Sequence, residues 1–214
     1  MLHLYWGDGK GKTTAAMGLA LRALGHGRRV VILQFLKDGS SGEIEMLRRC
    51  GAAVYACPNA KFTWLMTDAE RAEARRTNTR TLQTILQGSF DLLVLDEATS
   101  GLDPAARSEI LDILLDFIQD ERHSVLLSSH ITTDLEQIAD TIAYLHHGQL
   151  LFAKNKDDLM EEYGILRCSQ QDLDRLPPEW IAATCRTAAG CESLVHPRGS
   201  VLRALPPALM TLCA

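Results

Sequence analysis

A glycine-rich segment near the beginning of the chain carries two lysines and two threonines. It reads GDGKGKTT over residues 7–14 and directly follows the apolar segment LHLYW, residues 2–6. Glycines let a turn point several backbone N–H groups at one anion, and the positive end of a following helix strengthens the attraction. Such a loop binds the phosphates of a nucleoside triphosphate. The residues that we expect to hold these phosphates are Gly7, Asp8, Gly9, Lys10, Gly11, Lys12, Thr13 and Thr14.

The loop is one residue shorter than the usual phosphate-binding pattern G-x-x-x-x-G-K-[ST]. Counted back from Gly11, the first glycine of that pattern would be residue 6, but the glycine is residue 7. Lys12 still has the place of the lysine that reaches the phosphates, and Thr13 has that of the hydroxyl that binds Mg²⁺. Glycine, lysine and threonine all fall in place after a predicted strand. We therefore favour a binding loop over a turn that binds nothing.

Two acidic residues, Asp96 and Glu97, directly follow the apolar segment FDLLVL, residues 90–95. In an open sheet of parallel strands, ligands bind at the carboxyl ends of the strands, which places these residues beside the loop. We expect Asp96 to bind Mg²⁺ directly or through water, together with Thr13. Glu97 either completes the set of metal ligands or polarises a water molecule. The alternative is an acidic pair that only caps the next turn.

Three further side chains could contact a bound ligand. Phe62 and Trp64, in the segment FTW, would form a flat apolar surface for a large ring system, or would only pack their loop onto the domain. His130 follows the apolar segment SVLLSS, residues 124–129, at the edge where the acidic pair is expected. There it would contact a γ-phosphate or a water molecule, although a purely structural histidine fits the pattern equally well.

The segments between these motifs predict an α/β fold of three layers that positions them. Short apolar segments alternate with segments of helical period, which is typical of a mainly parallel sheet covered by helices on both faces. The long helix at 67–86 opens with Thr67 and Glu70 at the spacing of a capping box. The expected strands are residues 2–6, 29–35, 52–56, 90–95, 124–128, 141–146 and 150–153. The expected helices are residues 13–24, 43–49, 67–86, 104–119 and 133–139.

The alternation of helices and strands weakens after about residue 164. Residues 165–214 contain two Pro-Pro pairs and scattered Cys and Gly without a clear period. We predict a nucleotide-binding domain over residues 1–164. A small C-terminal α+β appendage, or a loosely ordered tail, is expected over residues 165–214.

Length and composition fit an ordinary α/β domain. The 214 residues carry a net charge of −5 and are 46% hydrophobic and 23% charged, which argues against nucleic acid as a partner. None of the six cysteines is part of a C-x-x-C pair, so we expect reduced thiols in a cytoplasmic protein. No apolar run reaches the roughly 18 residues of a membrane span. Because the chain opens on a predicted strand, we also expect no signal peptide.

Residues 1–97 resemble the P-loop corrinoid (cobalamin) adenosyltransferases. The matching features are the shortened loop, MGLALRALGHG at 17–27, VVILQFLK at 30–37, FTW at 62–64 and DLLVLDE at 91–97. The resemblance implies a P-loop NTPase fold in which the loop holds ATP, a Co(I) corrinoid attacks the ribose 5′ carbon, and triphosphate leaves. It also implies that Lys12, Thr13 and Glu97 serve ATP and Mg²⁺. Phe62 and Trp64 would then face the corrinoid.

Residues 93–214 resemble a different family, the ATP-binding subunits of ABC transporters. The matching features are LVLDEATSGLDP at 93–104, SVLLSSH at 124–130 and DLEQIADTIAYLHHGQLLF at 134–152. This resemblance implies that Glu97 is the base of a hydrolytic reaction. It further implies that Asp103 is the carboxylate of the D-loop and that His130 senses the γ-phosphate.

The two resemblances meet within LVLDEAT, a string that both families can carry. The spacing between Lys12 and Asp96 is shorter than an ABC subunit needs, and the sequence has no LSGGQ-like signature. The adenosyltransferase-like sequence ends just after Glu97. We therefore infer a chimera, natural or engineered, in which 1–97 is adenosyltransferase-like and 98–164 is ABC-like.

Three functions are compatible with these motifs. Transfer of an adenosyl group from ATP to a corrinoid is favoured by the short loop and the FTW segment. ATP hydrolysis that drives a transporter is the second, and only this function would require a membrane subunit as partner. The third is a nucleotide-binding scaffold without catalysis. The sequence is also compatible with a homodimer.

Overall fold

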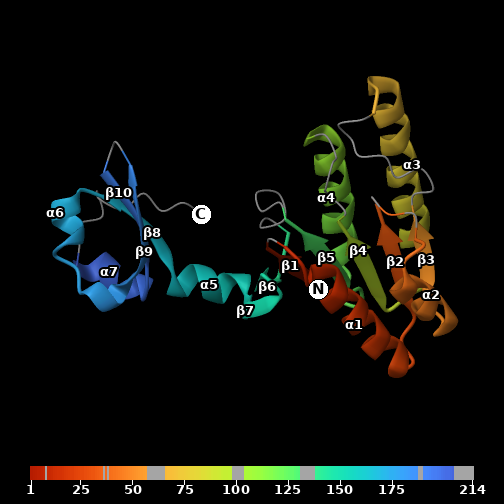
Figure 1. Ribbon diagram of the computed structural model, residues 1–214, viewed down its shortest axis with the longest axis horizontal. Helices are drawn as coiled ribbons and strands as arrows, with labels where there is room; N and C mark the ends of the chain where they lie inside the picture. The colour runs from red at the N-terminus through yellow and green to blue at the C-terminus, as the bar shows by residue number, and fades with distance from the viewer. Residues whose placement is uncertain are drawn as a thin grey trace. The chain divides into compact units, whose positions relative to one another are not determined.

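The computed structural model describes residues 1–7, 9–35, 37, 39–56, 66–97, 104–130, 138–187 and 190–204. The chain divides into two compact units, Met1–Ala153 and Lys154–Ala214. This division lies before residue 164, the point at which the sequence pattern weakens. Each unit has its own sheet (Figure 1).

A seven-stranded sheet forms the centre of the first unit. Its strands are β1 (Leu2–Trp6), β2 (Val30–Gln34), β3 (Ala53–Ala56), β4 (Leu92–Asp96), β5 (Val125–Ser129), β6 (Thr141–His146) and β7 (Gln149–Asn155). In space they follow the order β3-β2-β4-β5-β1-β6-β7. The pairs from β3 across to β6 are parallel, and a two-residue connection between β6 and β7 reverses the chain. β5 therefore lies between β1, which leads into the loop, and β4, which ends in Asp96.

Helices cover both faces of this sheet (Figure 1). They are α1 (Lys12–Gly25), α2 (Gly42–Arg49), α3 (Asp68–Leu86) and α4 (Pro104–Ile118). Along β4, Leu92 and Val94 pack with α1 and α2, whereas Leu93 and Leu95 pack with α3 and α4. Because both faces are buried, the central strands β2, β4 and β5 are largely apolar along their length rather than alternating. The predicted three-layer α/β fold is confirmed.

Most predicted elements end close to their observed bounds, and β4 shows why some differ. It begins at Leu92 rather than at residue 90. Phe90 is buried and stacks on Phe117, with 5.5 Å between the ring centroids. The carboxylate of Asp91 accepts the backbone N–H of Arg29 at 2.8 Å. These two residues therefore attach the segment before β4 to Phe117 and Arg29 instead of extending the strand.

The capping box predicted for the long helix is confirmed. Thr67 accepts the backbone N–H of Glu70 on its hydroxyl at 3.3 Å, and the Glu70 carboxylate accepts the backbone N–H of Thr67 at 2.8 Å. Two groups that would lack helical partners are thereby satisfied, and α3 begins at Asp68.

Two predicted segments lie wholly or partly outside the described residues. Of the predicted helix at 133–139, only Ile138 and Ala139 are described, and both side chains are buried in the core of the first unit. The last part of the C-terminal segment, 205–214, is also outside the described residues.

The second unit is a small α+β structure, one of the two arrangements expected for the C-terminal segment. Its antiparallel sheet has the order β8-β10-β9. Its elements are α5 (Lys156–Glu162), β8 (Gly164–Cys168), α6 (Gln170–Leu173), η2 (Pro178–Trp180), β9 (Ile181–Thr187), β10 (Gly190–Val195) and α7 (Arg198–Ala204). The core consists of Leu166, Cys168, Leu173, Leu176, Cys191, Val195 and Val201.

The described part of the chain contains four of the six cysteines. The four cysteines within it, Cys50, Cys168, Cys185 and Cys191, are free thiols. None of its helices is long and apolar enough to cross a bilayer.

Candidate active site

The glycine-rich loop between β1 and α1 has a backbone that requires glycine. Gly7, Gly9 and Gly11 have φ angles of 134°, 82° and 118°, a region that residues with a Cβ atom rarely adopt. A Cβ atom on Gly7 would also lie 1.8 Å from the carbonyl oxygen of Leu145 in β6. One on Gly11 would lie 3.3 Å from the Cα atom of Gly148. The loop is thus folded directly against β6 and the turn that follows it.

The start of α1 has the features of an anion site. Gly11 is its N-cap and has no side chain to accept from the first N–H groups, and the first turn contains no acidic residue. The positive end of the helix is therefore available to an external anion. Thr14 and Lys10, two of the residues predicted to bind phosphate, are exposed beside it.

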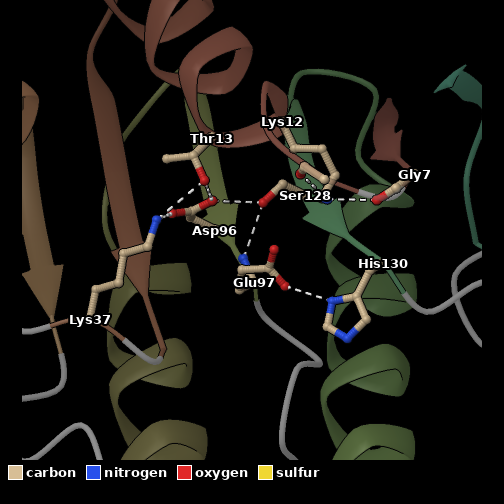
Figure 2. Close-up of polar contacts among 9 residues, drawn as sticks. Gly7, Lys12, Thr13, Lys37, Asp96, Glu97, Ser128 and His130 are labelled. Atoms are coloured by element: carbon tan, nitrogen blue, oxygen red, sulfur yellow. Dashed lines mark hydrogen bonds and ion pairs between the residues drawn. The ribbon is translucent and has the colours of Figure 1, made fainter. Parts of the chain in front are cut away.

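The side chain of Lys12 lies across the loop and places its ammonium against the loop backbone. Its side chain is only 6% exposed, and its ammonium donates to the carbonyl oxygens of Gly7 at 2.6 Å and Gly9 at 3.3 Å (Figure 2). Two carbonyl groups satisfy the ammonium only in part, since it has three donors. A phosphate oxygen is the natural further acceptor.

Strand register brings a polar row together at the carboxyl edge of the sheet. Gln34 of β2 is the direct partner of Asp96 in β4, and Asp96 is the direct partner of Ser128 in β5. All three side chains are buried. The amide of Gln34 and the hydroxyl of Ser128 donate to the two oxygens of the carboxylate at 3.0 and 2.8 Å.

Two residues outside the strands complete the surroundings of Asp96 (Figure 2). Thr13, in the first turn of α1, donates its hydroxyl to Oδ1 of Asp96 at 3.0 Å. Lys37, just beyond β2, places its Nζ atom 2.8 Å from Oδ2 of Asp96 and 3.2 Å from Oγ1 of Thr13. The loop and the acidic edge of the sheet therefore form one continuous site.

The carboxyl group of Asp96 is held in its ionised form. Burial acts first and alone would raise its pKa, because a side chain that is 1% exposed has lost its water. The ammonium of Lys37 and the donors from Ser128 and Gln34 outweigh that effect, and the pKa lies below the ordinary value of an aspartic acid. The site thus contains a buried, ionised carboxylate that favours a cation as its neighbour.

Glu97 faces His130 rather than Asp96. Its φ angle is 56°, and its backbone N–H donates to the carbonyl and hydroxyl oxygens of Ser128, each at 3.1 Å. This turn directs the side chain towards the end of β5, where Oε2 lies 3.1 Å from Nδ1 of His130 (Figure 2). A carboxylate can only accept, so the imidazole donates. The two residues form a pair next to the cluster around Asp96.

Thr13 and Asp96 have the chemistry of a magnesium site. Among the described residues, no group of three or more His, Cys, Asp or Glu side chains is arranged to hold a metal ion. Mg²⁺ does not need such a group, since it binds to one or two protein oxygens and completes its shell with water and substrate phosphates. A hydroxyl and an ionised carboxylate 3.0 Å apart fit this kind of coordination.

The structure thus brings most of the predicted site residues to one edge, and the rest lie beyond what it describes. Asp8, Phe62, Thr63, Trp64 and Asp103 are outside the described residues. Their roles stay predictions, as do the roles of the other site residues.

Sequence reasoning missed Gln34, Lys37 and Ser128. One signal could have found them, because each is a polar residue at the carboxyl end of an apolar segment that reads as a parallel strand. The missing information was which strands are neighbours.

A family model described as ATP:corrinoid adenosyltransferase BtuR/CobO/CobP matches residues 1–157 of the chain. The match continues well past residue 97, where the sequence suggested a change of resemblance. The predicted joint in the strand that ends at Asp96 therefore stays a prediction.

Similar proteins of two kinds are found. The chain is 30% identical over 151 residues to a corrinoid adenosyltransferase of Escherichia coli (strain K12), covering 68% of this chain and 76% of that protein. It is 37% identical over 106 residues to a corrinoid adenosyltransferase of Pseudomonas aeruginosa, covering 48% and 52%. It is also 33% identical over 104 residues to a putative ABC transporter ATP-binding protein of Mycoplasma pneumoniae, covering 46% of this chain and 31% of that protein. Both resemblances expected from the sequence are confirmed.

Proposed function

Because the chain belongs to the family of ATP:corrinoid adenosyltransferases, which are transferases, we propose that it moves the 5′-deoxyadenosyl group of ATP to the reduced cobalt of a corrinoid. In this reaction the Co(I) centre supplies an electron pair to the ribose 5′ carbon, and a cobalt–carbon bond forms. The bond between that carbon and the triphosphate oxygen breaks, and the oxygen keeps its electron pair. The products are the alkylated corrinoid and triphosphate.

One observation carries this proposal: Lys12 in the loop and the pair Thr13–Asp96 lie at the same edge of one sheet. The group that leaves is a highly charged triphosphate, so stabilising its charge favours the reaction. The N-terminus of α1 and the ammonium of Lys12 supply positive charge at the loop. For this, the remaining donor of the ammonium, or one released from a loop carbonyl, bonds to a phosphate oxygen.

We assign a magnesium ion to Thr13 and Asp96. Bound there with the triphosphate, it would neutralise charge on the leaving group. Thr13 belongs to the first turn of the helix that follows the loop, so a ligand on its hydroxyl is adjacent to the phosphates. Asp96 supplies the one ionised carboxylate that is buried at this point of the described structure.

Glu97 and His130 have a positioning role under this proposal. Adenosyl transfer needs no general base, because the attacking cobalt carries no proton. Their pairing at 3.1 Å instead fixes the turn after β4 and orders polar groups, or a water molecule, beside the metal. Phe62 and Trp64 are assigned to the corrinoid from their resemblance to the family.

ATP hydrolysis is the second candidate function. The observation that favours it is the pair Glu97–His130 at the ends of neighbouring strands, since a carboxylate that accepts from a histidine can orient a water molecule. The similarity to ABC transporter ATP-binding proteins supports the same function. A nucleotide-binding scaffold without catalysis is the third candidate.

An anaerobic assay with Mg·ATP and chemically reduced cobalamin tests the proposal. We expect triphosphate and the alkylated corrinoid in equal amounts. Chromatography measures the triphosphate, and the absorbance of the cobalt–carbon product measures the corrinoid. Orthophosphate release in the absence of corrinoid would favour hydrolysis instead. If the protein bound ATP but formed neither product, the proposal would be overturned. The nucleotide-binding scaffold would then be the remaining candidate.

Replacement of the two aromatic residues tests the corrinoid assignment separately. Phe62→Ala and Trp64→Ala should raise the KM for the corrinoid and leave the affinity for ATP unchanged. An unchanged transfer rate at low corrinoid concentration would contradict the assignment of these residues.

A further inference from the structure

The ammonium of Lys37 contacts the same two side chains to which the magnesium ion is assigned. Its Nζ atom lies 2.8 Å from Oδ2 of Asp96 and 3.2 Å from Oγ1 of Thr13, and these are the two side chains to which Mg²⁺ is assigned (Figure 2). An ion that bonds oxygens at roughly 2.1 Å would lie within a few ångströms of the ammonium. Two cations at such a distance repel each other strongly away from bulk water. Lys37 and a metal ion therefore compete for the same oxygens.

The buried carboxylate needs a positive partner at all times. Asp96 is 1% exposed, and an ionised group without water is costly unless it is paired and hydrogen-bonded. Gln34 and Ser128 are neutral donors, so they form hydrogen bonds with the carboxylate but do not compensate its charge. Among the described residues, Lys37 is the cation that forms an ion pair with Asp96.

Lys37 can leave, whereas Asp96 cannot. The carboxylate is fixed on a central strand, but the side chain of Lys37 lies beyond the end of β2 and is 38% exposed. A lysine carries its charge on a flexible stem with three freely rotating donors, so it changes partners at little cost. After nucleotide binding, the triphosphate would provide the ammonium of Lys37 with another anionic partner.

We propose that Lys37 stands in for the metal ion in the nucleotide-free protein, and that Mg·ATP displaces its ammonium from Thr13 and Asp96 onto the triphosphate. This inference rests on the proposed binding of magnesium at these two residues. It makes Lys37 a positioning residue that couples metal binding to nucleotide binding. The metal ion is excluded until the phosphates arrive, because they provide the ammonium with another anion.

Binding of Mn²⁺ to the protein without nucleotide tests the inference. The free ion gives a sharp electron paramagnetic resonance signal that is lost on binding, so its affinity is measured without any catalysis. We expect Lys37→Met to bind Mn²⁺ at least about tenfold more tightly than the wild type, since a competing charge has gone. Lys37→Arg, which keeps a charge, should remain close to the wild type. Equal affinity of Lys37→Met and the wild type would overturn the inference.

Further variants test whether a gain in Mn²⁺ affinity arises at Asp96. Lys10→Met removes one positive charge from an exposed position of the loop and should not gain Mn²⁺ affinity. An equal gain in Lys10→Met would mean a general charge effect and would overturn the inference. Adding Asp96→Asn to Lys37→Met should abolish the gain, and a gain that persists would overturn it as well. Lys37→Gln repeats the measurement if circular dichroism shows that Lys37→Met is poorly folded.

These outcomes are independent of the proposed function. The titration contains neither ATP nor corrinoid, so a gain in Mn²⁺ affinity would support the role of Lys37 even if adenosyl transfer failed. Adenosyl transfer with an unchanged Mn²⁺ affinity in Lys37→Met would overturn the role of Lys37 alone.

Discussion

The charge of Asp96 is the property of a single residue that organises the site. Its carboxylate receives donors from four places in the chain: the neighbouring strands β2 and β5, the first turn of α1, and Lys37 beyond the end of β2. The contacts from Lys37, Ser128 and Gln34 favour the ionised form, and together they outweigh the penalty of burial. The stability of the first unit should therefore depend on the protonation of this carboxyl group.

Comparison of the wild type with Asp96→Asn should reveal this dependence on pH. The pKa of Asp96 is lower in the folded protein than in the unfolded chain, so its contribution to stability is fully present above the unfolded value of about 3.9 and is lost as pH falls through the folded value. We expect the difference in free energy of unfolding between the two proteins to be constant near neutral pH and to shrink below about pH 4. Urea denaturation at a series of pH values measures it. A difference that stays constant into this acid range would contradict the assignment.

Replacement of the two loop lysines should separate a buried role from an exposed one. Lys12 is buried against the loop carbonyls, whereas Lys10 is exposed. We expect Lys12→Ala to lose at least about tenfold in affinity for Mg·ATP, because a charge-assisted contact with phosphate is lost. Lys10→Ala should lose less. Isothermal titration calorimetry measures both, and equal losses would refute the distinction.

At the scale of the elements, the contact between the loop and β6 determines which residues the loop can contain. The backbone of β6 approaches Gly7 so closely that a single methyl group would collide with a carbonyl oxygen. β6 is paired with β1 from Thr141 to Tyr144, directly before Leu145, which limits how far either partner can move. The loop conformation is therefore fixed by the sheet as well as by its own glycines.

Two glycine replacements in adjacent elements should have opposite effects. Gly7→Ala places a Cβ atom 1.8 Å from the oxygen of Leu145 at a φ angle of 134°, and should destabilise the protein by at least about 2 kcal/mol. A Cβ atom on Gly18, within α1, meets none of the described residues within 4 Å. Gly18→Ala should be neutral or stabilise the protein by up to about 1 kcal/mol. Chemical denaturation measures both changes, and a neutral Gly7→Ala would show that the loop is not held by β6.

The elements also show what could be predicted from the sequence. The central strands β2, β4 and β5 were predictable because they are apolar on both faces, and the helices because they alternate with such strands. Thr13 was predictable because it belongs to the loop motif, and Asp96 because it ends an apolar strand. The contacts of Gln34, Lys37 and Ser128 were not, because they depend on β4 lying between β2 and β5, and strand order is a property of the folded sheet.

At the scale of the whole molecule, the described residues of the site all belong to the first unit. The second unit has a separate core that includes Val201 and Leu166. A ligand that binds one unit stabilises only that unit, unless the two unfold together. Calorimetry should therefore distinguish them.

We expect two unfolding transitions in differential scanning calorimetry. Mg·ATP should raise the midpoint of one and leave the other unchanged. Val201→Ala removes buried methyl groups at a cost of about 1–3 kcal/mol and should lower only the transition that the nucleotide does not shift. Leu127→Ala, in the core of the first unit, should lower the transition that the nucleotide does shift. A Val201→Ala effect on the nucleotide-dependent transition would refute this separation.

The atom of β6 that faces Gly7 is a main-chain carbonyl oxygen. Any amino acid at position 145 would present the same atom, provided that the strand kept its register beside β1. Segments of different ancestry could thus be exchanged behind the loop without altering its shape. For a chain that is similar to two groups of proteins, such an exchange would leave the contact between the loop and β6 in place.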